Sequence, residues 1–181
     1  MLGLLLALAS TGPLPGGDTA LTVTAGTPFY SVRLDHGLTD RFDIGLGLDV
    51  SASGFLRPLL QSRMRIWANE SLRLSLRAAA AYVLPTLRSS GFGPRPIART
   101  GDGELGLNLD WTLVPRLFAF VELSALGETD GKVEHSAAFA QGLLGLEWAT
   151  TASLSLLARG GVLQGSRARA PVGSAGVAWH F

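Results

Sequence analysis

The sequence contains no cysteine, a single lysine and only one long apolar run. Without cysteine the chain can form neither a disulfide framework nor a cysteine zinc site, and it fits an oxidising compartment in which unpaired thiols are a liability. Its three histidines lack the spacing of zinc ligands. Fifteen basic and fourteen acidic residues give a net charge of +1. We therefore expect no metal, no cofactor and no nucleic-acid partner.

The single long apolar run lies at the start of the chain, in residues 1–10. It is shorter than the roughly 20 residues that a membrane-spanning helix needs. Small residues, proline and glycine follow it up to Gly17, as in a secretory signal, although no lysine or arginine precedes it. We predict a signal peptide or N-terminal segment in residues 1–17 and one domain in residues 18–181. A short buried or interfacial segment is the alternative.

Beyond residue 18 apolar residues recur at every second position, which is typical of half-buried strands. In residues 42–50 the even positions are Phe, Ile, Leu, Leu and Val, whereas the odd positions are Asp or Gly. The same alternation recurs in 72–82, 104–113, 154–162 and 174–181. A helix would spread the acidic residues around its surface, but a strand places them on one face. The pattern predicts an all-β fold.

Connections between these segments alternate in length. Short turns are predicted at 39–40, 69–70, 114–116 and 149–152, and longer connections near 52–57, 86–101, 128–135 and 164–171. This alternation predicts an antiparallel up-and-down barrel, and transmembrane barrels have short turns at one end and longer loops at the other. Counting back from the C-terminus gives about ten strands. Eight is the alternative, if 18–38 is one long strand and another weakly alternating segment is not a strand.

Alternation does not say which face is inside, because a soluble lipocalin-like barrel buries its leucines and exposes its charges. Two features favour a transmembrane barrel. The charged face contains no lysine, balances its signs, and intersperses arginine with small residues, which suits a narrow lumen filled by ion pairs. Aromatic residues gather near strand ends, as in the girdles of membrane barrels. This predicted girdle consists of Trp111, Trp148, Trp179, Phe181, Tyr30 and Tyr82.

The C-terminal segment 177–181 alternates apolar residues and ends in Phe181. It resembles the signal by which the bacterial barrel assembly machinery recognises outer-membrane barrels. Leu38-Thr-Asp-Arg-Phe42 is similar to the periplasmic turn of small barrels of the outer membrane protein A or X type. The resemblance implies a Gram-negative outer-membrane location, contact with lipid and lipopolysaccharide, and assembly through Phe181. It implies no activity.

The predicted lumen carries a polar network of six basic and seven acidic residues. These are Arg33, Asp35, Asp43, Asp49, Arg63, Arg65, Arg73, Arg77, Glu104, Asp110, Glu122, Glu147 and Arg159. Lipopolysaccharide phosphates could be bound by loop arginines, because arginine forks pair well with phosphate. These are Arg88, Arg95, Arg99, Arg167 and Arg169. Simple solvated loop charge is the alternative.

No catalytic residue is predicted. His135-Ser136, with Glu134 or Glu128, is the one place that could mimic a lipid A deacylase, but neighbouring residues on a strand point to opposite faces. Gly101-Asp-Gly-Glu104 lacks the strand, helix and lysine context of a nucleotide loop. We expect a non-enzymatic, porin-like barrel with a plugged lumen, acting as a structural or interaction component of the envelope. Other envelope proteins are expected partners of such a component. The alternatives are a small pore for polar solutes and a lipid-modifying enzyme.

Overall fold

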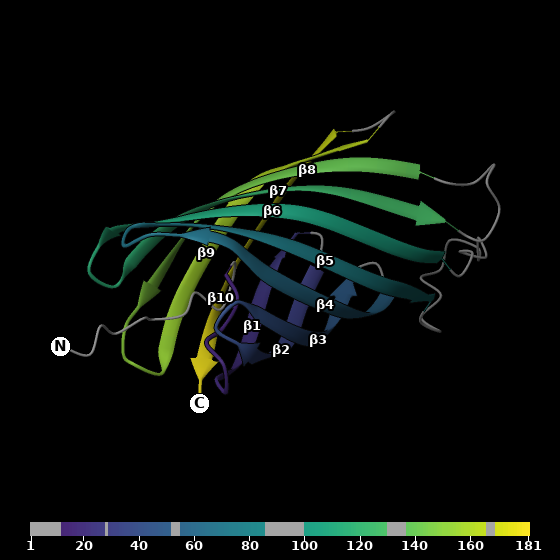
Figure 1. Cartoon of the computed structure of the whole chain (residues 1–181). Helices are drawn as coiled ribbons and strands as arrows, with labels where there is room; N and C mark the ends of the chain where they lie inside the picture. The colour runs from purple at the N-terminus through teal and green to yellow at the C-terminus, as the bar shows by residue number, and fades with distance from the viewer. Residues whose placement is uncertain (1–11, 28, 52–54, 86–99, 130–136, 166–168) are drawn as a thin grey trace.

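The computed structural model describes residues 12–27, 29–51, 55–85, 100–129, 137–165 and 169–181. These residues form ten strands (Figure 1). The strands are β1 (Thr19–Thr27), β2 (Phe29–Thr39), β3 (Phe42–Ser51), β4 (Phe55–Ala68), β5 (Leu72–Pro85), β6 (Thr100–Val114), β7 (Leu117–Thr129), β8 (Ala137–Ala149), β9 (Leu154–Gly165) and β10 (Arg169–His180). Within these residues there is no helix of the length and apolarity that crossing a bilayer requires.

Each strand pairs antiparallel with its sequence neighbour, and β1 pairs with β10, so that the sheet closes into a barrel. Closure extends to the chain end, where the amides of Thr19 and Phe181 each donate to the carbonyl of the other at 2.9 Å. The predicted ten-stranded up-and-down barrel is confirmed. The eight-stranded alternative is wrong, because residues 18–38 contain two strands that pair with each other.

Both described chain ends lie at the end of the barrel that carries the tight turns (Figure 1). The predicted short turns are present between β2 and β3, β4 and β5, β6 and β7, and β8 and β9. In the third of these turns Arg116 adopts a left-handed φ of 73°, which allows the tight reversal. The opposite end carries the other connections and is called here the long-connection end.

The long connections are shorter than predicted, because the strands continue into them. Residues 55–57, 100–101, 128–129, 164–165 and 169–171 belong to strands. Glycine and proline in these segments had indicated loops, but Pro171 lies within a paired strand. Pro58, which follows the first of these segments, is also paired. At Pro58 the ladder to β5 skips two residues while the ladder to β3 continues, so the missing amide is tolerated on one side.

Three register shifts lie beside tight turns, between Gly37 and Thr39, Arg65 and Trp67, and Thr112 and Val114. A bulge breaks the alternation of faces, so two successive residues can point the same way. In β4 both Ile66 and Trp67 are exposed as a result. Strict alternation from the buried Arg63 would have turned Trp67 inward.

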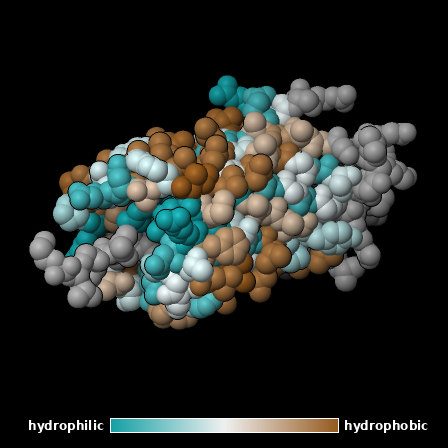
Figure 2. Space-filling view, in the orientation of Figure 1, coloured by the Kyte–Doolittle hydropathy of each residue, from teal (hydrophilic) through white to brown (hydrophobic). Residues whose placement is uncertain are grey.

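The outer wall of the barrel is largely apolar (Figure 2), whereas the charged side chains of the predicted lumen network are buried or half-buried inside. Leu46 and Leu107 are 64% and 47% exposed, whereas Asp43 and Arg63 are 0% and 2% exposed. Exposed leucines cost little in lipid, and buried charges are tolerated when they are paired. The soluble alternative, with leucines inside and charges outside, is therefore wrong.

Candidate functional site

The lumen is the candidate site, because alternation within each strand turns its polar residues inward. All thirteen charged residues of the predicted network lie on the lumen face of their strands. Two further charged residues belong to the same network, although neither was part of the predicted lumen. Arg57 lay in a predicted connection, and Asp102 lay just beyond one. Continuing the alternation of 59–65 and 104–110 by one step toward the long connections would have placed both in the lumen.

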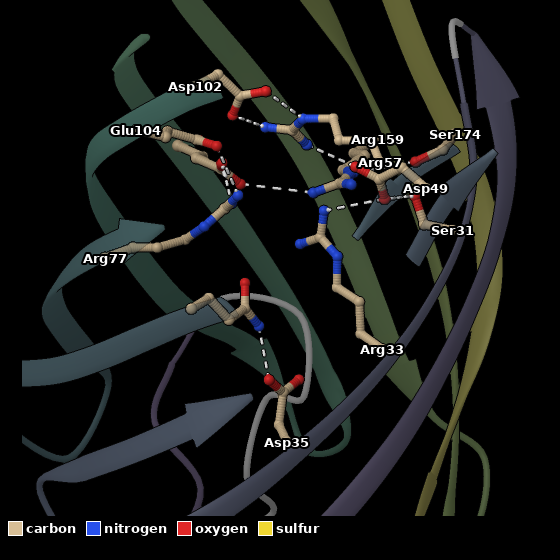
Figure 3. Close-up of polar contacts among 12 residues, drawn as sticks. Ser31, Arg33, Asp35, Asp49, Arg57, Arg77, Asp102, Glu104, Arg159 and Ser174 are labelled. Carbon is tan, nitrogen blue, oxygen red and sulfur yellow. Dashed lines mark hydrogen bonds and ion pairs between the residues drawn. The ribbon is translucent and has the colours of Figure 1, made fainter. Parts of the chain in front are cut away.

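One cluster of ion pairs is centred on Arg57 in β4. Its Nη1 donates to Oδ2 of Asp49 at 2.6 Å, and its Nη2 and Nε donate to Asp102 at 2.6 and 2.8 Å. Ser31 donates a further hydrogen bond to Asp49 at 2.6 Å. Two-point contacts of this kind are the strong form of an arginine–carboxylate pair. They connect β3, β4 and β6 across the lumen (Figure 3).

A second cluster is centred on Arg77 in β5. Its Nη1 donates to Glu122 at 2.6 Å and its Nη2 to Glu104 at 2.9 Å. Arg159 approaches the other oxygen of Glu122 at 3.5 Å and donates from Nε to Ser174 at 3.0 Å. Strands β5, β6, β7, β9 and β10 are therefore joined through one group of side chains.

A third cluster is centred on Arg63, a fully buried residue of β4. Its Nη2 donates to Asp43 at 2.6 Å and lies 3.5 Å from Asp35. Gln61, which the sequence analysis did not select, donates to Asp35 at 2.6 Å. Arg63 faces Arg77 directly in the register of β4 and β5, so the surrounding carboxylates must offset two adjacent positive charges.

The sequence had suggested a lumen filled by ion pairs, but aromatic side chains fill part of it. Phe118 and Phe120 of β7 point inward and are buried, although they were not part of the predicted interior. Gly145 of β8 makes room for the Phe120 ring, since a Cβ there would come within 2.3 Å of it. The tight-turn end of the lumen therefore combines aromatic packing with ion pairs.

Residues 12–17, called here the N-terminal strap, lie in the mouth of the lumen at the tight-turn end. Leu14 is fully buried, and its amide donates to Asp43 at 2.9 Å. Arg65 donates to the Pro13 carbonyl at 3.1 Å. The Gly17 amide donates to the Gly37 carbonyl at 2.8 Å. Residues 1–11 lie outside the described part of the chain, so the signal peptide stays a prediction.

Gly37 lets the strap approach the wall, because a Cβ there would lie 1.9 Å from the Pro15 carbonyl oxygen. We expect Gly37→Ala to displace the strap. The measurement is maleimide labelling of Leu14→Cys, which is readable because the chain has no other cysteine. The thiol should be protected in the parent and reactive in the Gly37→Ala background. Gly103→Ala is the matched control, since its Cβ meets nothing within 4 Å, and equal labelling in both backgrounds would contradict this role.

The predicted aromatic girdle faces outward. Trp148, Trp179 and Phe181 are exposed at the tight-turn end, and Tyr30 and Tyr82 at the long-connection end. Trp111 lies half-buried on the outer face, and Trp67 joins the tight-turn group through the bulge in β4. Rings at these positions suit the two boundaries of a bilayer.

Most residues of the predicted loop sites lie in segments that the structure does not describe. Arg88, Arg95, Arg99, Arg167, Glu134, His135 and Ser136 lie outside the described residues. Arg169 is exposed at the start of β10, and Glu128 lines the cavity described next. Within the described ranges no three histidine or acidic side chains are grouped so that they could hold a metal ion.

A cavity of about 230 Å³ occupies the lumen toward the long-connection end. Its charged lining includes Arg33, Arg57, Arg77 and Arg159 together with their carboxylate partners. A second space of about 20 Å³ continues past Arg33 and Arg159 toward Asp35 and Gln61. The space inside the lumen is therefore larger on the long-connection side of Arg33 and Arg159 than on the tight-turn side.

No protein-family model matches the sequence, and no curated protein matches it either. Among solved structures the fold is similar to a bacterial polysaccharide outer membrane secretin, with a TM-score of 0.54 and 11% identity over 90% of this chain and 63% of that chain. The chain thus spans less than two thirds of that protein. It is also similar to a KdgM porin, with a TM-score of 0.50 and 10% identity over 91% of this chain and 99% of that chain.

These similarities concern the fold. They agree with the apolar outer wall, the charged lumen and the aromatic residues at both ends, and they support the predicted location in the bacterial outer membrane. The chain is a small, closed β-barrel of the outer-membrane type.

Proposed function

We propose that this chain is a non-enzymatic outer-membrane barrel with a closed lumen, acting as a structural or interaction component of the cell envelope. The observation that carries the proposal is the set of ion pairs that join non-neighbouring strands through the lumen. Arg57 of β4 reaches Asp102 of β6, and Arg77 of β5 reaches Glu122 of β7. Because these side chains meet inside the barrel, they occupy the path that a solute would follow.

The N-terminal strap supports the same proposal from the other side. With Leu14 fully buried beside Ala20 and Ala178, the mouth at the tight-turn end is filled by the chain itself. A ten-stranded lumen is only slightly wider than an eight-stranded one, which side chains can fill completely. The alternative of a small pore for polar solutes is favoured by one observation, the cavity of about 230 Å³ on the other side of the ion pairs.

The proposal includes four partners. Lipid would contact the leucine-rich outer wall, and lipopolysaccharide phosphate would contact exposed arginines such as Arg169. The barrel assembly machinery would recognise the last strand through Phe181, which is 72% exposed. Contact with other envelope proteins remains part of the proposed interaction role.

Single-channel recording in planar lipid bilayers tests the closed lumen. We expect no discrete conductance steps from the refolded full chain. A variant with Arg77→Ser, Glu104→Ser and Glu122→Ser shortens one ion-pair cluster and should produce steps. Arg159 loses its ion pair with Glu122 in this variant but keeps its hydrogen bond to Ser174. Heat-modifiable gel migration verifies that each protein is folded. Reproducible channels from the unchanged chain would instead support the pore alternative.

A further inference from the structure

Arg33 of β2 is buried in the lumen without a hydrogen bond to any described residue. Its closest carboxylate oxygen belongs to Asp49 and lies 3.9 Å from Nη2, which is beyond hydrogen-bonding distance. Its Nε is buried and has no hydrogen-bond partner. The whole side chain is only 14% exposed, so bulk water satisfies few of its donors. A guanidinium carries five N–H donors, and leaving them unsatisfied inside a protein is costly. This arginine therefore needs an acceptor.

The acceptors nearest to Arg33 are already engaged by other groups. Asp49 accepts from Arg57 and from Ser31, both at 2.6 Å. Arg159, which lines both lumen spaces with Arg33, is also weakly paired, because Arg77 holds Glu122 at 2.6 Å and leaves Arg159 at 3.5 Å. Two guanidinium groups thus retain donors beside the same cavity (Figure 3).

The other part of the cavity lining is apolar. At the long-connection end a collar of inward-facing side chains surrounds the space above the arginines. This apolar collar consists of Phe29, Leu126, Phe139, Leu143, Leu163 and Val172. Ligand pockets commonly pair an apolar wall with a few placed polar groups that fix orientation. The cavity has this arrangement, with arginines and their carboxylate partners at its base and apolar side chains near its mouth.

We propose that this cavity binds a small amphipathic monocarboxylate, with the carboxylate on Arg33 and Arg159 and the apolar body within the collar. A planar carboxylate offers two acceptor oxygens to the unsatisfied donors, and arginine binds such groups with two-point geometry. For size, an apolar cavity of about 150 Å³ accommodates benzene, so about 230 Å³ leaves space for a ring and its head group. The inference goes beyond the closed-barrel proposal and does not depend on it.

Isothermal titration calorimetry of the full chain in zwitterionic micelles, corrected for empty micelles, tests the site. The probe is phenylacetate. Phenylacetamide has nearly the same shape without the charge, and acetate has the charge without the ring. We expect saturable binding of phenylacetate at one site, and binding weaker by at least about tenfold for each of the other two. Phenylacetamide lacks the hydrogen bonds of a charged carboxylate, and acetate lacks the apolar area of the ring.

Three variants locate the site. Arg33→Gln should weaken phenylacetate binding by at least about tenfold and leave phenylacetamide unchanged, whereas Phe139→Ser should weaken both ligands. The matched control is Arg73→Gln, a lumen arginine that does not line the cavity. Because Arg33 holds no hydrogen bond, Arg33→Gln should not lower the midpoint of urea unfolding, which separates a binding role from a structural one.

The proposal is wrong if phenylacetate does not bind, if the amide binds equally well, or if Arg33→Gln leaves the affinity unchanged. These outcomes are distinct from failure of the closed lumen. A barrel that conducts but still binds phenylacetate through Arg33 would support the carboxylate site and contradict the closed lumen. A barrel that neither conducts nor binds phenylacetate would support the closed lumen and contradict the carboxylate site.

Discussion

Replacing Arg77 with methionine is expected to lower the free energy of unfolding by about 3–5 kcal/mol, the usual cost of removing one partner from a buried ion pair. Methionine fills much of the space but offers no donor to Glu104 or Glu122, which Arg77 contacts at 2.9 and 2.6 Å. Both carboxylates are almost completely buried. They would lose their closest cation, and water cannot replace it without entering the lumen.

The measurement is urea unfolding in lipid vesicles, followed by tryptophan fluorescence. Adding Glu104→Gln and Glu122→Gln to the Arg77→Met chain should recover most of the loss, because the two buried carboxylates are then replaced by neutral amides. Arg159 loses its ion pair with Glu122 but keeps its hydrogen bond to Ser174. A loss below about 1 kcal/mol, the range of an exposed pair, would mean that water already reaches this cluster.

Replacing Leu107 with arginine is expected to destabilise the barrel by about 2–4 kcal/mol in lipid, as for charged residues on the lipid face near the bilayer midplane. Leu107 is 47% exposed and lies at the centre of β6. Its replacement removes no internal contact comparable to that of a buried core residue. The cost therefore comes from placing a cation against hydrocarbon rather than from a cavity.

The matched control is Leu38→Arg, at a side chain that is 50% exposed beside a tight turn. Near the bilayer boundary the same change should cost no more than about 1 kcal/mol, because the arginine can reach headgroups and water. Unfolding free energies in vesicles provide the comparison. Equal costs at the two positions would contradict the assigned membrane depth, and two costs near zero would favour a protein that folds in water.

Most of the architecture follows from the sequence, because a two-residue period fixes which face each side chain occupies. Segments such as 42–50 and 104–113 alternate without interruption, so strand identity and lumen residues could both be read from them. The inside-out orientation required a second kind of signal, since alternation is unchanged when the two faces are exchanged. The absence of lysine from the charged face and the position of aromatic residues near strand ends supplied that signal.

Other features of the structure depend on effects that the two-residue alternation of apolar and polar residues does not predict. Trp67 faces outward because a bulge shifts the phase of β4, and a bulge has no sequence signature comparable to a turn. Arg57 was assigned to a connection, and Asp102 was left outside the predicted strands, because nearby glycine and proline usually end strands. The N-terminal strap could not be foreseen, since its position depends on hydrogen bonds with β2, β3 and β4.

The ion pairs that cross the lumen also have a consequence for how the chain folds. Arg57 and Asp102 are 45 residues apart, as are Arg77 and Glu122, and each pair skips an intervening strand. A hairpin of β3 and β4, or of β5 and β6, contains only one carboxylate partner of each arginine, Asp49 or Glu104, and lacks Asp102 or Glu122. Charge neutralisation is therefore complete only when the sheet curves toward closure. Partly folded forms carry an electrostatic penalty that the closed barrel lacks, which favours a cooperative transition with few stable intermediates.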